Sequence, residues 1–177
     1  MSNRTFTVFI LIIIAVFSRL IPHPWNLTAV GSVALFAGAY LKPRSLAFAV
    51  PLLAFLITDL ILGLHNTMLF TYAAVAFCSF LGIRYLQKPK PVSVLGMSLT
   101  SSVIFFVISN FGVWIVGGLY PLTAQGLLNC FVMALPFSQG QIIGDLLHSA
   151  LLFGIYAVVA KKFQFPSDSL SVPSSNC

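Results

Sequence analysis

Apolar segments long enough to cross a lipid bilayer make up most of this chain, and short breaks rich in proline, glycine or basic residues separate them. A helix needs about 20 apolar residues to span the hydrocarbon core of a membrane. Hydrophobic residues account for 59% of the 177 residues and charged residues for only 7%, which is too little charge for the surface of a soluble domain. The sequence therefore predicts an all-α membrane protein.

The breaks divide the chain into six expected transmembrane helices. Their expected ranges are residues 6–21, 28–41, 45–62, 67–86, 92–116 and 141–160. The long segment 120–140 is apolar enough to lie at the membrane interface or to dip into it. Six spans use roughly 120 residues, so we expect a single six-helix domain over residues 1–162. The tail over residues 163–177 is rich in Ser and Pro, which predicts a disordered cytoplasmic segment.

The positions of the basic residues predict the orientation of the bundle. With the N-terminus in the cytoplasm, eight of the nine Lys and Arg residues fall on the cytoplasmic side and only Arg19 lies outside. Cytoplasmic loops carry an excess of Lys and Arg, so we expect both termini to be cytoplasmic. The basic residues occur in small groups between the apolar segments, as in the loops of membrane proteins. Nucleic acid is therefore not an expected partner, despite the net charge of +6.

Several polar residues fall at the opposite, outer ends of the expected helices. They are Arg19, His23, Trp25, Asn26, Asp59, His65, Asn110, Trp114, Asp145 and His148. Polar groups inside a membrane are costly unless they are paired or hydrated. Their common placement predicts a polar cavity that opens to the outside.

Two pairings of these residues are open. Arg19 is expected to form an ion pair or a shared polar network with either Asp59 or Asp145, whether to hold helices together or to serve a site. His148 follows Asp145 by three residues and shares its helix face. That spacing suits a metal or proton pair, but it more often indicates a structural, hydrogen-bonded pair.

Cys78 is the most specific single residue. It lies 11 positions into the expected helix 67–86, which places it about 16 Å deep, near the middle of the membrane. A cysteine there is either a small apolar residue of the core or, as a thiolate, a soft ligand for a metal.

Common catalytic and nucleotide-binding motifs are absent from the sequence. It contains no phosphate-binding loop, no nucleophile elbow and no Cys-x-x-Cys pair. The chain itself therefore offers no nucleotide site, and an intramembrane enzyme would have to rely on Asp59, Asp145 and histidines such as His148.

Residues from about 19 to 155 resemble a family of small bacterial membrane proteins that includes the BtuM-type cobalamin transporters. These proteins are similar to the substrate-binding S-components of energy-coupling factor transporters. The resemblance lies in RLIPHPWNLT (19–28), ALFAGAY (34–40), TDLILGLH (58–65), NFGVW (110–114), GGLYP (117–121) and GDL (144–146).

The resemblance implies a six-helix S-component-like fold in the bacterial inner membrane. The implied function is uptake of cobalamin, or a related corrinoid, from a cavity on the outer side. A helix cysteine matching Cys78 would be the axial cobalt ligand, and removal of the upper cobalt ligand would be a minor enzymatic activity beside transport. The expected ligand-binding residues are Arg19, His23, Asp59, Tyr72, Phe77, Cys78, Asn110, Trp114, Tyr120 and Asp145.

The expected partners are cobalamin or another small substrate, membrane lipid and an energy-coupling module of a coupling subunit and ATPases. Three alternatives remain. The chain could carry another vitamin or small cofactor, it could be an intramembrane enzyme using Asp59, Asp145 and His148, or it could serve only to assemble with other membrane proteins.

Overall fold

The computed structural model describes residues 3–20, 27 and 29–162, and it is entirely helical over them. The helices are α1 (Asn3–Leu20), α2 (Val30–Tyr40), α3 (Arg44–Leu62), α4 (Met68–Tyr85), α5 (Pro91–Val116) and α6 (Ala124–Lys162). The first five begin and end within three residues of the ranges expected from the sequence. The all-α class is therefore confirmed, whereas the predicted tail lies outside the described residues.

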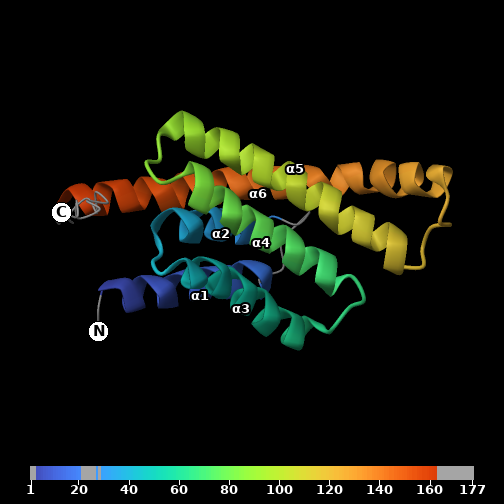
Figure 1. The fold of residues 1–177 in the computed structure, drawn as a ribbon, viewed down its shortest axis with the longest axis horizontal. Coiled ribbons are helices and arrows are strands. Elements are labelled where there is room, and N and C mark those ends of the chain that lie inside the picture. The colour runs from blue at the N-terminus through green and yellow to red at the C-terminus, as the bar shows by residue number, and fades with distance from the viewer. Residues whose placement is uncertain (1–2, 21–26, 28, 163–177) are drawn as a thin grey trace, which may run out of the picture.

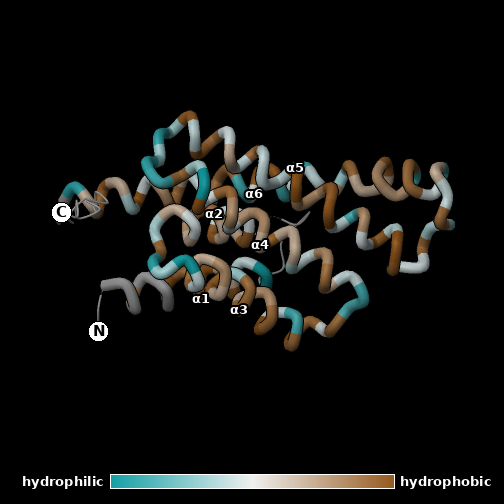
Figure 2. Tube along the Cα trace, in the orientation of Figure 1, coloured by the Kyte–Doolittle hydropathy of each residue, from teal (hydrophilic) through white to brown (hydrophobic). Residues whose placement is uncertain are grey.

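Four of the helices, α3 to α6, are long and apolar enough to cross a membrane. The described apolar parts of α1 and α2, Ile10–Leu20 and Val30–Tyr40, are shorter. Large apolar side chains cover the outside of the bundle, and Figure 2 shows hydrophilic residues mainly at its ends and turns. An apolar exterior of this kind is expected of a protein whose solvent is lipid.

Helix α6 is much longer than predicted. It has 39 residues and includes Pro136, so the expected connection over residues 120–140 and the expected start at Gln141 are wrong. Lipid offers no hydrogen-bond partner to the backbone, which makes a helix the favourable form of an apolar segment even where it contains a proline. Figure 1 shows the end of α5 and the beginning of α6 extending together beyond the other helices.

The short helix α2 lies at the centre of the bundle and packs against all five other helices. Its backbone touches that of α4, since a Cβ on Gly38 would overlap the Ser79 carbonyl oxygen and one on Gly82 would overlap that of Leu35. Small residues allow such close approach between membrane helices. The pair Ala34 and Gly38, four residues apart, thus serves packing within this chain.

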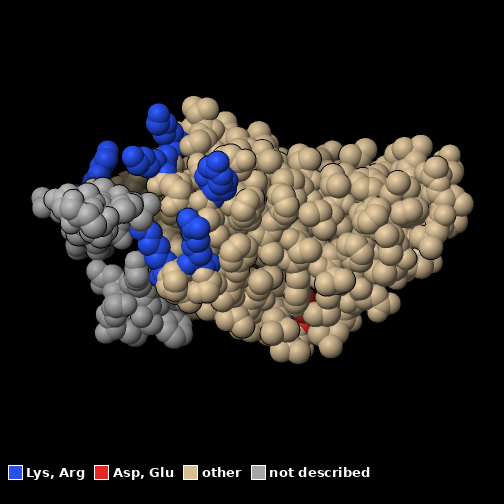
Figure 3. Space-filling view, viewed as in Figure 1, with Lys and Arg blue, Asp and Glu red and all other residues tan. Residues whose placement is uncertain are grey.

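The described basic side chains other than Arg19 lie at one end of the bundle, which we call the basic end (Figure 3). They are Lys42, Arg44, Arg84, Lys88, Lys90 and Lys161. The start of α1 and the end of α6 are also at this end (Figure 1). We call the opposite end, where α3 meets α4 and α5 meets α6, the far end.

Candidate functional site

Arg19 and Asp59 form a buried ion pair between α1 and α3 toward the far end. Arg19 Nη1 lies 2.8 Å from Asp59 Oδ1, and the Asp59 side chain is only 1% exposed. The same nitrogen donates a hydrogen bond to the Thr58 hydroxyl. Of the two partners that the sequence left open for Arg19, the structure selects Asp59.

Tyr72 extends this pair to a third helix. Its hydroxyl donates to Asp59 Oδ2 at 3.0 Å, and His65 Nε2 lies 4.0 Å from the same oxygen. The Arg19 guanidinium lies over the Phe55 ring, 4.1 Å from its centroid. We call Arg19, Asp59 and Tyr72 the ion-pair network, which joins α1, α3 and α4.

Cys78 lies near the middle of α4, completely buried. Its Sγ donates to the Ser101 carbonyl oxygen on α5 at 3.7 Å. The hydroxyls of Ser79 and Ser101 are also buried, and neither has a hydrogen-bond partner among the described residues. Unsatisfied buried hydroxyls are uncommon in native proteins, so the surroundings of Cys78 retain unused capacity for hydrogen bonding.

Aromatic side chains separate Cys78 from the ion-pair network. Cys78 and Phe55 belong to one buried cluster, against which Tyr72 and Phe105 pack. The Phe55 ring lies 6.1 Å from Tyr72 and 6.4 Å from Phe105, centroid to centroid. Phe55 therefore contacts both the Arg19 guanidinium and the environment of the thiol.

A groove of about 310 Å³ lies beside this cluster, between α4, α5 and α6. We call it the far groove, and its lining residues are Thr71, Phe105, Phe106, Ser109, Asn110, Val113, Ala134, Phe137, Ser138 and Gln141. Phe105 lines the groove and also packs against the Cys78 cluster. Phe105 is thus shared by the groove and by the surroundings of the buried cluster that contains the thiol.

Other predicted site residues lie elsewhere. Phe77 is 45% exposed and packs against Phe80 on the surface of the bundle. Trp114 donates its indole N–H to the Pro121 carbonyl oxygen at 3.0 Å and so braces the turn between α5 and α6. Tyr120 lies in that turn. These three are separate from the Cys78 cluster as the structure describes it.

Asn110 and His23 complete the predicted set. Asn110 lines the far groove, where its side-chain amide donates to the Phe106 carbonyl oxygen at 2.8 Å. His23 lies outside the described residues.

Asp145 occupies a second polar site, between α2, α5 and α6. It is 2% exposed. The Ser102 hydroxyl donates to its Oδ2 at 2.7 Å, and the Ser32 hydroxyl lies 3.4 Å from its Oδ1. His148 Nδ1 lies 2.8 Å from the Gly144 carbonyl oxygen, so this hydrogen bond takes the place of the predicted pairing with Asp145.

The residues predicted for the site are mainly charged and aromatic, so the serine residues around Asp145 were missed. Their signal was the helical spacing: Ser98 and Ser102 are four residues apart, as are Asp145 and Ser149. Residues at this spacing share one helix face.

These features define a helical membrane protein with two separate buried carboxylates, one paired with arginine and one held by serine hydroxyls. Among the described residues, no three His, Cys, Asp or Glu side chains gather as a metal site. The chain belongs to DUF6580, a family of unknown function whose model matches residues 1–169. No curated protein and no solved structure matches it.

Proposed function

We propose that this chain is a substrate-binding subunit for uptake across the bacterial inner membrane, with cobalamin or a related corrinoid as substrate. Both termini are then cytoplasmic and the basic end faces the cytoplasm. The far groove takes up substrate from outside, and Cys78 supplies a thiolate ligand to cobalt. Energy comes from a partner module, because the sequence carries no phosphate-binding loop.

The observation that carries the proposal is the position of Cys78. Its thiol lies in the middle of a membrane helix, in a buried cluster against which the groove residue Phe105 packs. Thiolates are suitable ligands for soft metal centres, and the positive charge of the metal offsets the cost of a buried anion. The unused hydroxyls of Ser79 and Ser101 are available to the polar groups of a ligand.

Substrate binding requires Phe105 and the neighbouring parts of α4 and α5 to move. The far groove, at about 310 Å³, is at the lower limit of the roughly 300–1,000 Å³ typical of small-molecule pockets, and a corrinoid is a large ligand. In this arrangement the ion-pair network fixes α1 and α3 against α4 while α5 moves. Phe105 acts as the partition that the substrate displaces.

The visible spectrum of cobalamin tests the proposal. Cobalamin added to the purified protein should show a shifted absorption spectrum, because the axial ligand determines the electronic transitions of the corrin. Cys78→Ser should abolish the shift while the protein remains folded, since the change is almost isosteric. Cys130→Ser is the matched control, because Cys130 is buried like Cys78 but donates to the Asn110 carbonyl oxygen on another part of α5.

Two outcomes would overturn this assignment. If the Cys78→Ser protein binds cobalamin with the parent's affinity and spectrum, Cys78 is a packing residue of the core. If the wild-type protein binds no corrinoid at all, the substrate is a different small molecule.

A further inference from the structure

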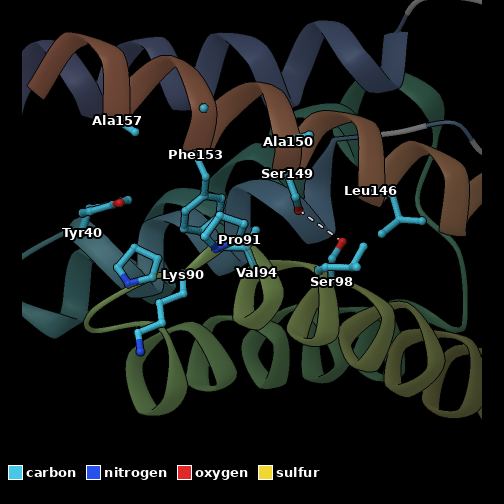
Figure 4. Close-up of a pocket in the computed structure, with 13 residues that line it drawn as sticks. Tyr40, Lys90, Pro91, Val94, Ser98, Leu146, Ser149, Ala150, Phe153 and Ala157 are labelled. Atoms are coloured by element: carbon cyan, nitrogen blue, oxygen red, sulfur yellow. Dashed lines mark hydrogen bonds between the residues drawn. The ribbon is translucent and has the colours of Figure 1, made fainter. Parts of the chain in front are cut away.

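Polar side chains form a continuous row along the contact between α5 and α6. On α6, Gln141, Asp145 and Ser149 follow one another at intervals of four residues, and on α5 Ser98 and Ser102 do the same. Figure 4 shows the hydrogen bond that joins Ser149 to Ser98. We call these five residues the polar ladder.

Hydrogen bonds connect the rungs of the ladder. Ser102 Oγ donates to Asp145 Oδ2 at 2.7 Å and lies 3.1 Å from the Ser98 carbonyl oxygen. Gln141 Nε2 donates to the Ser102 carbonyl oxygen at 3.5 Å, and Ser149 Oγ donates to Ser98 Oγ at 3.2 Å. Asp145 is the only ionisable member.

The ladder has a groove at each end. Gln141 lines the far groove. Ser98 and Ser149 line a second groove of about 470 Å³ that reaches Lys90 and Tyr40 at the basic end, which we call the basic-end groove (Figure 4). Asp145 therefore lies about one helical turn from Gln141 of the far groove and from Ser149 of the basic-end groove. Residues four apart on α6 are separated by about 6 Å along the axis.

The surroundings of Asp145 suit a proton better than a metal ion. The Ser102 hydroxyl donates to the carboxylate, and the Ser32 hydroxyl donates to the Asp145 backbone carbonyl oxygen at 2.9 Å and lies 3.4 Å from Oδ1. A Cβ added to Gly31 on α2 would overlap the carboxylate oxygens. Packing this close leaves no room for a coordinated cation. Among the described residues, the Lys, Arg and His ion pairs involve Asp59 and none involves Asp145.

Few titratable groups face Asp145 from the neighbouring helices. Helix α6 packs against α2 and α5; α5 contains no titratable residue, and α2 has only Tyr40, at its opposite end. From α4, the Cys78 thiol lies within electrostatic range. On α6 itself, His148 is nearby but its Nδ1 is engaged by Gly144. Asp145 is therefore the main ionisable group of this region among the described residues.

We propose that Asp145 is a proton-exchange site that serves both grooves, so that the polar ladder forms a proton route through the bundle. Asp145 itself lines neither groove, so water that passes Gln141 or Ser149 brings the proton to a carboxylate oxygen of Asp145. The same O–H bond breaks when the proton leaves to water in the other groove, so no net change remains in the protein. An ionised carboxylate without a cationic partner is costly in a membrane interior, which couples the charge of Asp145 to the packing of α2, α5 and α6.

Infrared spectroscopy can observe this carboxyl directly, because the sequence contains no Glu and only three aspartates, Asp59, Asp145 and Asp168. In a detergent without ester groups, the C=O stretch of a protonated side-chain carboxyl therefore has few sources. We expect a band whose intensity changes with pH as Asp145 gains and loses its proton. Asp145→Asn should remove this band, whereas Asp168→Asn should leave it unchanged.

Two further variants separate a loss of the band from misfolding and test whether the proton follows the polar ladder. Ser102→Ala removes the shortest hydrogen bond to the carboxyl and should shift the frequency of the band without removing it. Transfer into D₂O should shift the band quickly in the wild type and more slowly in the double variant Gln141→Leu, Ser149→Ala. The control is Ser138→Ala, which changes the far groove outside the ladder.

The proposal fails if no carboxyl band responds to pH, or if the band persists in Asp145→Asn. The proposed route along the polar ladder is wrong if the carboxyl proton exchanges for deuterium as fast in the double variant as in the wild type. Neither measurement uses a substrate, so the outcome is independent of the corrinoid assignment.

Discussion

At the scale of single residues, the two buried carboxylates illustrate two ways to place an acid in a membrane protein. Asp59 is neutralised by Arg19 and further held by Tyr72. Asp145 is held by hydroxyls alone in the described part of the chain. The first arrangement joins helices with fixed charges, whereas the second leaves a group whose charge can change.

The ion pair predicts a characteristic pattern of stability. Asp59→Leu leaves Arg19 without its partner and should lower the free energy of unfolding by about 3–5 kcal/mol, the usual effect of breaking a buried pair. Thermal unfolding in detergent measures the loss. The double variant Arg19→Leu, Asp59→Leu should be clearly more stable than Asp59→Leu, because an apolar pair leaves no buried charge unpaired. Equal stability of Asp59→Leu and the wild type would contradict this role.

At the scale of elements, the contact between α2 and α4 determines how closely the bundle packs. Gly38 and Gly82 bring the two backbones into direct contact. Since α2 also packs against α6 and supplies Ser32 to Asp145, its position affects both buried carboxylate sites through the surrounding helices.

Gly82→Ala should therefore destabilise the protein by about 1–3 kcal/mol, as overpacking of a tight core usually does. Its added methyl group would meet the Leu35 carbonyl oxygen, which cannot move without shifting α2. Gly154→Ala is the matched control, because a Cβ there meets no atom within 4 Å and alanine is the better helix former. In thermal unfolding, the melting temperature of the control should equal or exceed that of the wild type. Similar losses of stability in both variants would contradict the packing argument.

At the scale of the whole molecule, the basic side chains at one end provide a direct test of orientation. Single cysteines introduced at Lys88 and Asn66 lie in turns at opposite ends of the bundle. In intact cells, an impermeant thiol reagent should label Asn66→Cys, whereas Lys88→Cys should react only after the membrane is opened. A background without Cys177 removes competing labelling. Labelling of Lys88→Cys from outside would reverse the orientation and place the far groove in the cytoplasm.

The sequence alone determined the all-α class, the bounds of the first five helices to within three residues, and the expectation that Arg19 pairs with an aspartate. Hydropathy along the chain suffices for this, because transfer of a segment into lipid depends on its own composition. Only the tertiary structure decided that Arg19 pairs with Asp59 rather than Asp145, and that Phe77 lies on the surface. Such choices depend on which helix faces meet.

The dependence on which helix faces meet also explains why the length of α6 and the contacts of the serines were not predicted. The segment 120–140 was expected to be a connection at the membrane interface, yet α6 begins at Ala124 and continues through Pro136 beside α5. Single serines in apolar helices look unremarkable, and their role becomes visible only when Ser32, Ser102 and Asp145 from three helices meet. A chain in lipid must satisfy its polar groups internally, and the packing of the helices determines which partners do so.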